Sequence, residues 1–216
     1  MNGINAYLFD LDGTILDSKS AIVNVFFRLC QKYGSKTFTL QEIDSQFGNS
    51  FKSIMASLDS QKKKEIEAEY YRLMIEEEQK KAKLFPAIRE NIVYLKECGH
   101  KIALVTNKEK LIVLKSLRRF QLFELFNGIV TINDVQNPKP HQEPVTKALS
   151  IIGASKEEAL MIGDSVFDVY AAQNAGIQSV VIDWYNRYPL TEIRPDYYFR
   201  NIGEFMLRNT TRKDAM

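Results

Sequence analysis

The sequence predicts an α/β protein with a mostly parallel sheet and an all-helical insertion near its N-terminus. After residue 85, short apolar runs alternate with helical patterns, and this alternation is typical of right-handed βαβ units. Runs such as residues 159–162 contain no polar side chain, as expected for strands covered on both faces. Between residues 17 and 82 the pattern is helical throughout. The chain should therefore fold as a parallel-sheet core that carries a helical domain.

Short apolar runs mark the expected strands of the core. These strands should cover residues 4–9, 101–105, 129–132, 159–162, 179–182 and 197–199. Helical patterns lie between them, beginning with one whose apolar positions are Ile88, Ile92 and Leu95 and which ends at Gly99. Each strand should thus be followed by a helix that returns the chain to the same edge of the sheet.

The insertion reads as a set of helices. Apolar residues at helical spacing predict a first helix, capped by Asp17 or Ser18 and ended by Gly34. The expected helices cover residues 18–33, a short stretch opened by the capping box of Thr39 and Glu42, then 50–58 and 61–82. Because Phe85-Pro86 ends this series, we assign residues 1–16 and 84–216 to the core and 17–83 to an inserted cap domain.

Composition limits the possible partners. The chain has 216 residues and a formal net charge of only +2, so neither nucleic acid nor a membrane surface is indicated as a partner. Cys30 and Cys98 are far apart in the sequence, which argues against a zinc site and fits a reducing cytoplasm. No apolar run approaches the roughly 18 residues of a membrane helix, and the start of the chain does not resemble a signal peptide. We expect a cytoplasmic protein.

Two acids follow the first predicted strand. Successive side chains of an extended segment point to opposite sides, so Asp10 and Asp12 should face the same small volume. Gly13 comes next and allows a ligand to approach the main-chain N–H groups of the turn. A calcium loop of the EF-hand type would need its glycine at the sixth position, whereas this glycine is the fourth residue from Asp10. Acids beside exposed amides instead suggest a metal ion and a phosphate.

Polar residues also follow the later strands. Thr106 and Asn107 come after the second strand, and Lys139 follows the third after a loop. Asp164 and Asp168 come after the fourth strand. Ligands of open parallel sheets bind beyond the carboxyl ends of the strands, so these side chains should gather at one edge. Each residue alone could be an ordinary turn or cap, but together they indicate a site.

The chemistry that suits these residues is phosphoryl transfer. A phosphate and a carboxylate repel each other by about 4 kcal/mol at 4 Å and an effective dielectric constant near 20. Mg²⁺ bound by Asp10 and Asp164, together with the ammonium group of Lys139, would offset that repulsion. Thr106 and the turn amides would donate hydrogen bonds. One acid could then attack phosphorus while the other, two residues away, protonates the leaving oxygen and later activates water.

With these residues assembled, the chain resembles the haloacid dehalogenase-like hydrolase superfamily. The resemblance spans nearly the whole chain and is closest to phosphoglycolate phosphatase-like and pyrophosphatase-like members, which have a Rossmann-like core and a helical cap. The matching motifs are Phe9-Asp10-Leu11-Asp12-Gly13-Thr14, Val105-Thr106-Asn107, Lys139-Pro140 and Gly163-Asp164-Ser165-Val166-Phe167-Asp168. Relatives usually have glycine where this chain has Ala87.

The resemblance implies a role for each matched residue. Asp10 would be the nucleophile and Asp12 the general acid and base, and the second acid favours phosphatase chemistry over dehalogenation. The residues implied to bind phosphate are Thr106, Asn107 and Lys139. The implied metal ligands are Asp10, Asp12, Asp164 and Asp168, with Asp168 acting through water or instead orienting Lys139. The expected cofactor is Mg²⁺.

Three alternatives remain open from the sequence. An inorganic pyrophosphatase would use the same residues on a different substrate. A receiver-like phosphoacceptor module also combines acids, a threonine and a lysine on a parallel sheet, but it has no helical insertion. A catalytically silent scaffold would not need the complete set of acids. The favoured interpretation is a phosphatase that acts on a small phosphorylated metabolite as a monomer or a homodimer.

Overall fold

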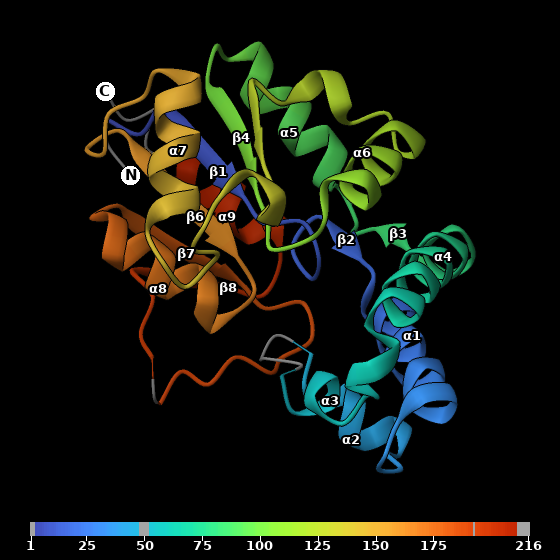
Figure 1. Ribbon diagram of the computed structural model, residues 1–216. Coiled ribbons are helices and arrows are strands. Elements are labelled where there is room, and N and C mark those ends of the chain that lie inside the picture. The colour runs from blue at the N-terminus through green and yellow to red at the C-terminus, as the bar shows by residue number, and fades with distance from the viewer. Residues whose placement is uncertain (1–2, 48–51, 192, 211–216) are drawn as a thin grey trace. The chain divides into compact units, whose positions relative to one another are not determined.

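The computed structural model describes residues 3–47, 52–191 and 193–210. By the contacts within the chain, it divides into two compact units (Figure 1). One unit consists of Met1–Ile15 and Leu84–Met216, and the other of Leu16–Lys83. The chain therefore crosses between the two units twice. It enters the second unit shortly after the turn at Gly13 and returns to the first immediately before Phe85, and these two places are called the crossings below.

The first unit is built on a parallel sheet. Within the described residues this sheet has six strands, in the order β5-β4-β1-β6-β7-β8, and the neighbouring strands pair in parallel. The strands are β1 (Ala6–Phe9), β4 (Lys101–Val105), β5 (Gly128–Val130), β6 (Ala159–Gly163), β7 (Gln178–Ile182) and β8 (Tyr197–Phe199). Strand β1 lies between β4 and β6, so the chain that follows it emerges at the centre of the sheet (Figure 1). The predicted α/β class is confirmed.

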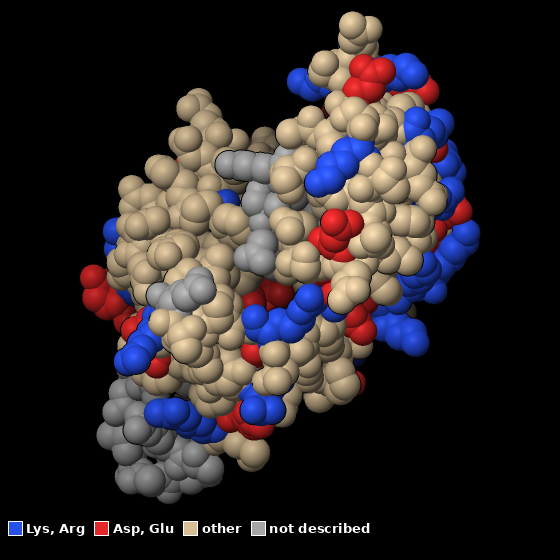
Figure 2. Space-filling view, turned by 90° about the horizontal axis from the view of Figure 1, so that it is seen from below, with Lys and Arg blue, Asp and Glu red and all other residues tan. Residues whose placement is uncertain are grey.

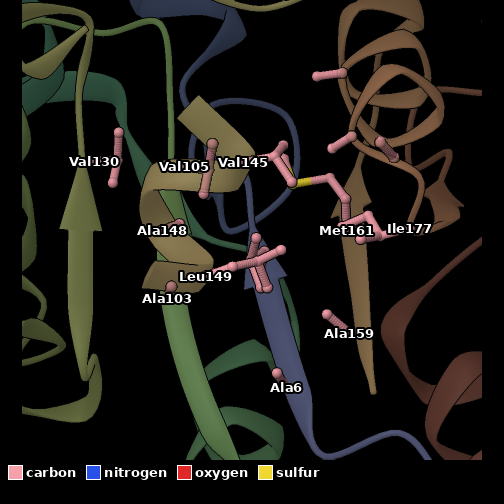
Figure 3. Packing of buried hydrophobic residues seen from close by; sticks show 14 of the residues in the cluster. Ala6, Ala103, Val105, Val130, Val145, Ala148, Leu149, Ala159, Met161 and Ile177 are labelled. Carbon is pink, nitrogen blue, oxygen red and sulfur yellow. The ribbon is translucent and has the colours of Figure 1, made fainter. Parts of the chain in front are cut away.

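Two helices cover one face of this sheet. They are α7 (Glu143–Ile152) and α8 (Val166–Ala175), which pack on β4, β5, β6 and β7. Their apolar side chains meet alternate residues of the strands, including Ala6, Ala103 and Met161, in one buried cluster (Figure 3). Small strand residues such as Ala6 and Ala103 let helix α7 lie close to the strands, with Leu149 against them (Figure 3).

The intervening residues of the strands point to the opposite face. There, α5 (Ile88–Glu97) packs against β4 and against α9 (Ile202–Thr210). The ring of Tyr7 in β1 makes edge contacts with His100 and with Phe205 of α9. The remaining helical segments of this unit are α6 (Lys110–Arg119), η2 (Phe123–Leu125) and η3 (Ile132–Asp134). The sheet is thus buried on both faces, as its uninterrupted apolar strands require.

The second unit is helical between its two crossings. Its helices are α1 (Lys19–Tyr33), α2 (Leu40–Asp44), α3 (Lys52–Ala56), η1 (Ser60–Lys62) and α4 (Lys63–Lys81). Helices α1 and α4 pack along each other, and Arg28 donates a hydrogen bond to the buried Glu77 at 2.9 Å. The predicted capping box is present, because Thr39 and Glu42 hydrogen-bond reciprocally at the start of α2. Basic and acidic side chains both occur across the face seen in Figure 2.

Some predicted boundaries are wrong. At the crossings the chain forms a two-stranded ribbon, β2 (Leu16–Asp17) with β3 (Lys83–Leu84), which was not predicted. The strand predicted at 129–132 ends at Val130, because Thr131 and Asp134 form a capping box that opens η3. The first strand is likewise shorter than the predicted 4–9. The start of the helix predicted at 50–58 lies outside the described residues.

Throughout the described part of the chain, every helix is too short or too polar to cross a lipid bilayer.

Candidate active site

The turn after β1 brings two acids to the centre of the sheet edge. Asp10 is buried, whereas the side chain of Asp12 is 18% exposed. Gly13 has a φ of +82°, and a Cβ built on it would overlap the carboxylate of Asp164. Glycine is therefore required here for two reasons, its left-handed backbone and the approach of that carboxylate.

Lys139 holds the first of these acids in place. Its ammonium group donates hydrogen bonds to Asp10 Oδ1 at 2.8 Å, to Asp168 Oδ1 at 2.6 Å and to the carbonyl oxygen of Val105 at 3.0 Å. An ammonium group carries three hydrogens, so these bonds use all of them. In this arrangement Lys139 orients Asp10 and adds positive charge, and it has no hydrogen left to donate to a phosphate.

Asp168 is fully engaged within the protein. Its Oδ2 accepts hydrogen bonds from the backbone N–H and the hydroxyl group of Ser165, at 3.1 and 2.6 Å, which caps the start of α8. Its Oδ1 accepts from Lys139. A Cβ at Gly163 would overlap this carboxylate, so glycine is again needed at the end of β6. Of the two roles implied for Asp168, this geometry matches the orientation of Lys139.

Asn107 clamps the loop that carries Lys139. Its side-chain N–H group donates to the carbonyl oxygen of Lys139, and its Oδ1 accepts from the backbone N–H of Lys139, both at 2.9 Å. These two bonds use the amide oxygen and one of the two side-chain N–H hydrogens of Asn107. The buried hydroxyl of Thr106 accepts a hydrogen bond from the backbone N–H of Lys108 at 3.2 Å, and its own hydrogen can donate elsewhere.

The sequence interpretation missed Lys108. This residue directly follows the Thr106-Asn107 pair, and its ammonium group donates a hydrogen bond to Asp12 Oδ1 at 2.7 Å. Its side chain is 3% exposed, whereas most lysines lie at the surface. The available signal was its position, three residues beyond the end of β4 and on the same edge as the acids.

The acids of this site carry more negative charge than the neighbouring ammonium group balances. Burial, and to a smaller degree Asp168 and Asp12, outweigh Lys139 and raise the pKa of Asp10 from 3.8 to about 7. The pKa of Asp164 is also raised, first by burial and then by Asp168 and Asp10. Burial lowers the pKa of Lys139, but its contacts with the two carboxylates more than compensate and raise it. The ionised site therefore favours an additional cation.

These carboxylates fit a hard divalent cation. Ligand atoms of Asp10, Asp164 and Asp168 lie within 4.8 Å of one another. Since both oxygens of Asp168 already accept hydrogen bonds, Asp10 and Asp164 are best suited to bind the ion directly. Thr14 supports Asp164 with a long hydrogen bond of 3.4 Å. Asp12, the other predicted ligand, does not belong to this group of three and is bound to Lys108.

An aromatic pair borders the same turn. The ring of Trp184 stacks on Phe85 with a centroid distance of 4.5 Å and an interplanar angle of 2°. Its indole N–H donates to the carbonyl oxygen of Thr14 at 3.2 Å. The turn after β1 and the loop after β7 are therefore joined through one side chain.

Two residues outside the motifs also have defined positions. The imidazole Nδ1 of His141 accepts a hydrogen bond from the backbone N–H of Glu143 at 3.1 Å and so supports the start of α7. His100 lies 3.0 Å from the side-chain oxygen of Asn5 and contacts Tyr7. Gly48 lies outside the described residues.

The comparisons with known proteins agree with the fold. The sequence pattern of the family described as haloacid dehalogenase-like hydrolase matches residues 7–182. The chain therefore belongs to the haloacid dehalogenase-like hydrolases and is an enzyme of their phosphatase branch.

Curated relatives and solved structures cover nearly the full chain. Pyrophosphatase PpaX from Bacillus cereus (strain AH820) is 31% identical over 205 residues, which cover 94% of this chain and 95% of that protein. A haloacid dehalogenase-like protein from Bacteroides fragilis has a TM-score of 0.83 at 25% identity and covers 94% and 99% of the two chains. A haloacid dehalogenase-like family hydrolase from Streptococcus pneumoniae has a TM-score of 0.80 at 26% identity, covering 97% and 100%. These relatives favour the hydrolase over the receiver-like module.

Proposed function

We propose that this enzyme is a Mg²⁺-dependent phosphatase that hydrolyses small phosphate monoesters of the phosphoglycolate type through an aspartyl-phosphate on Asp10. The observation that carries the proposal is the pairing of Asp10 with Lys139, with Asp12 two residues away on its own lysine. A carboxylate fixed by an ammonium group is suited to nucleophilic attack, and a second carboxyl group is suited to proton transfer.

Both acids act in each half of the reaction. An oxygen of Asp10 attacks phosphorus, the bond to the leaving oxygen breaks, and that oxygen takes the electron pair and a proton from Asp12. In the second half, Asp12 removes a proton from water, whose oxygen attacks phosphorus and displaces the carboxylate of Asp10. Lys139 keeps Asp10 oriented throughout. The hydroxyl group of Thr106 and the amides beside Gly13 donate hydrogen bonds to the phosphoryl oxygens.

Mg²⁺ would be held by Asp10 and Asp164, with Asp168 acting through Lys139. When bound, the ion supplies positive charge that offsets the repulsion between the carboxylates and the phosphate. The raised pKa values of Asp10 and Asp164 support this assignment, because an added cation removes the cost of ionising both groups.

Inorganic pyrophosphatase is the second candidate function. It is favoured by the Bacillus cereus relative described as a pyrophosphatase, at 31% identity over nearly the full length of both chains. The same residues would cleave the bond between the two phosphates, with orthophosphate as the leaving group.

The helical unit is proposed to act as a cap that restricts the enzyme to small substrates. Its support is the position of the insertion, which begins three residues after Gly13 and returns at Leu84. Closure of such a unit expels water and strengthens electrostatic interactions in a site. A cytoplasmic location and a monomeric or homodimeric state belong to the same proposal.

The test is turnover of a panel of phosphate compounds by the purified protein with and without Mg²⁺. We expect Mg²⁺-dependent release of orthophosphate from phosphoglycolate or pyrophosphate. In a rapid acid quench during turnover, the phosphoryl group should be trapped on Asp10 and located by borohydride reduction and peptide mapping. Two successive displacements should also leave the configuration at phosphorus unchanged overall, and inversion would show that water attacks directly and would refute the aspartyl-phosphate.

A further inference from the structure

Lys108 places a second buried ammonium group in the site. Its backbone N–H donates to Thr106 Oγ1 at 3.2 Å, and its Nζ donates to Asp12 Oδ1 at 2.7 Å. Both ends of the residue are therefore fixed. Since Asp12 is the acid assigned to proton transfer, this positive charge lies beside the general acid and not beside the nucleophile.

The two lysines serve different parts of the site. Lys139 donates all three of its hydrogens to protein oxygens and lies between Asp10 and Asp168. Lys108 instead pairs with Asp12. Of the two acids Asp10 and Asp12, Asp12 is the more exposed, with 18% of its side chain exposed against 11% for Asp10. The nucleophile and the general acid thus each have their own cation.

The position of the leaving group follows from the position of Asp12. A carboxyl group that protonates the leaving oxygen must lie within about 3.2 Å of it. Because the ammonium group of Lys108 is 2.7 Å from Asp12 Oδ1, it lies within a few ångströms of any leaving oxygen bound there. A charged group one or two bonds beyond that oxygen can then reach Lys108 directly. A neutral group in the same place gains much less, because a buried ammonium group interacts most strongly with an anion.

We propose that Lys108 is a specificity-determining residue that selects substrates whose leaving group carries its own negative charge, as a carboxylate or a second phosphate. The inference rests on the proposed function, in which Asp12 is the general acid. With this role of Lys108, one site would accept both phosphoglycolate and pyrophosphate, because both leaving groups are anionic next to the scissile oxygen. Monoesters of neutral alcohols would be poor substrates.

A matched pair of substrates tests this role. Phosphoglycolate and 2-hydroxyethyl phosphate differ in that a carboxylate of the first is replaced by a hydroxymethyl group in the second. For the wild-type enzyme, kcat/KM should be about 100-fold higher for phosphoglycolate. In Lys108→Met the ratio should fall to within about threefold, mainly through loss of activity on phosphoglycolate. Lys108→Arg keeps the charge and should retain most of the preference.

The control is Lys110→Met, which removes an exposed lysine that pairs with Asp134. It should leave the substrate ratio unchanged. Equal losses on both substrates in Lys108→Met would mean that Lys108 only positions Asp12, and the proposal would be wrong.

The wild-type ratio of kcat/KM for phosphoglycolate to kcat/KM for 2-hydroxyethyl phosphate tests the role of Lys108 even if a variant does not fold. A ratio near one, with clear Mg²⁺-dependent turnover of both esters, would overturn the role of Lys108 and leave the proposed function standing. If the wild-type enzyme hydrolysed neither these esters nor pyrophosphate, the proposed function and the role of Lys108 would both be lost.

Discussion

Replacing Asp10 by Asn should stabilise the metal-free protein while abolishing its activity. Asp10 and Asp168 pair with the ammonium group of Lys139, and Asp164 lies close to both carboxylates, so the ionised site carries surplus negative charge. Asn has nearly the same shape as Asp, and its side-chain oxygen can still accept the hydrogen bond from Lys139. The substitution therefore removes a charge without removing the contact.

The size of the effect follows from the pKa of Asp10. The folded protein raises this pKa from 3.8 to about 7, and the difference corresponds to about 4 kcal/mol of unfolding free energy. The folded state binds the proton of the Asp10 carboxyl group more tightly than the unfolded state does. The stability that this bound proton contributes is therefore complete below pH 4 and is lost as the pH rises through about 7. Since Asp164 titrates in the same site, we expect Asp10→Asn to gain about 2–4 kcal/mol at pH 8 and close to nothing at pH 4.

Urea unfolding between pH 4 and pH 8 measures this effect, with EDTA present to remove metal. The control is Asp134→Asn, because a hydrogen bond from Thr131 and the charge of Lys110 outweigh burial and lower the pKa of Asp134. This variant should lose stability at pH 8 instead of gaining it. Saturating Mg²⁺ should stabilise the wild-type protein far more than Asp10→Asn. If Asp10→Asn were no more stable than the wild type at pH 8 without metal, surplus negative charge at this site would be refuted.

Three further predictions concern the backbone at Ala87, the metal and the loop of Lys139. Ala87 has a left-handed backbone with a φ of 58°, so Ala87→Gly should raise the unfolding free energy measured in urea by about 0.5–1 kcal/mol. The control Ala82→Gly, at a φ of −70°, should lower the unfolding free energy. Asp164→Asn should raise the Mg²⁺ concentration for half-maximal rate at least about 10-fold, and Asp168→Asn less than about threefold; equal shifts would contradict the assigned ligands. Asn107→Ala should lower kcat about 10-fold or more by releasing the loop of Lys139, and a change in KM alone would instead indicate direct phosphate binding.

Much of the fold could be predicted because its determinants are local. The apolar run of β4 was predicted at its full extent, since a buried parallel strand is continuously apolar and the flanking polar residues end it. The end of β5 was missed because Ile132 continues the apolar run, while the capping box of Thr131 and Asp134 already turns the chain. The ribbon β2–β3 was missed because each of its strands has only two residues, which is too short to show an alternating pattern of apolar and polar side chains.

The site could be predicted as a set of residues but not as a set of contacts. Strand ends placed Asp10, Thr106, Lys139 and Asp164 at one edge, because parallel strands share a direction. The partners of each side chain depend on distances between segments far apart in the sequence. The clamp between Asn107 and Lys139 joins residues 32 apart, and no local pattern specifies it.

Trp184, which stacks on Phe85, is an intrinsic fluorescence probe of this enzyme. The chain has a single tryptophan, so indole fluorescence comes from one place in the molecule. That place is next to the residue where the chain returns from the helical unit, and it is hydrogen-bonded to Thr14, whose hydroxyl group contacts Asp164. Any rearrangement of the turn around a metal ion or a phosphate would change the surroundings of this one indole. Titrations and stopped-flow kinetics of the unlabelled protein can therefore follow ligand binding at the acids directly.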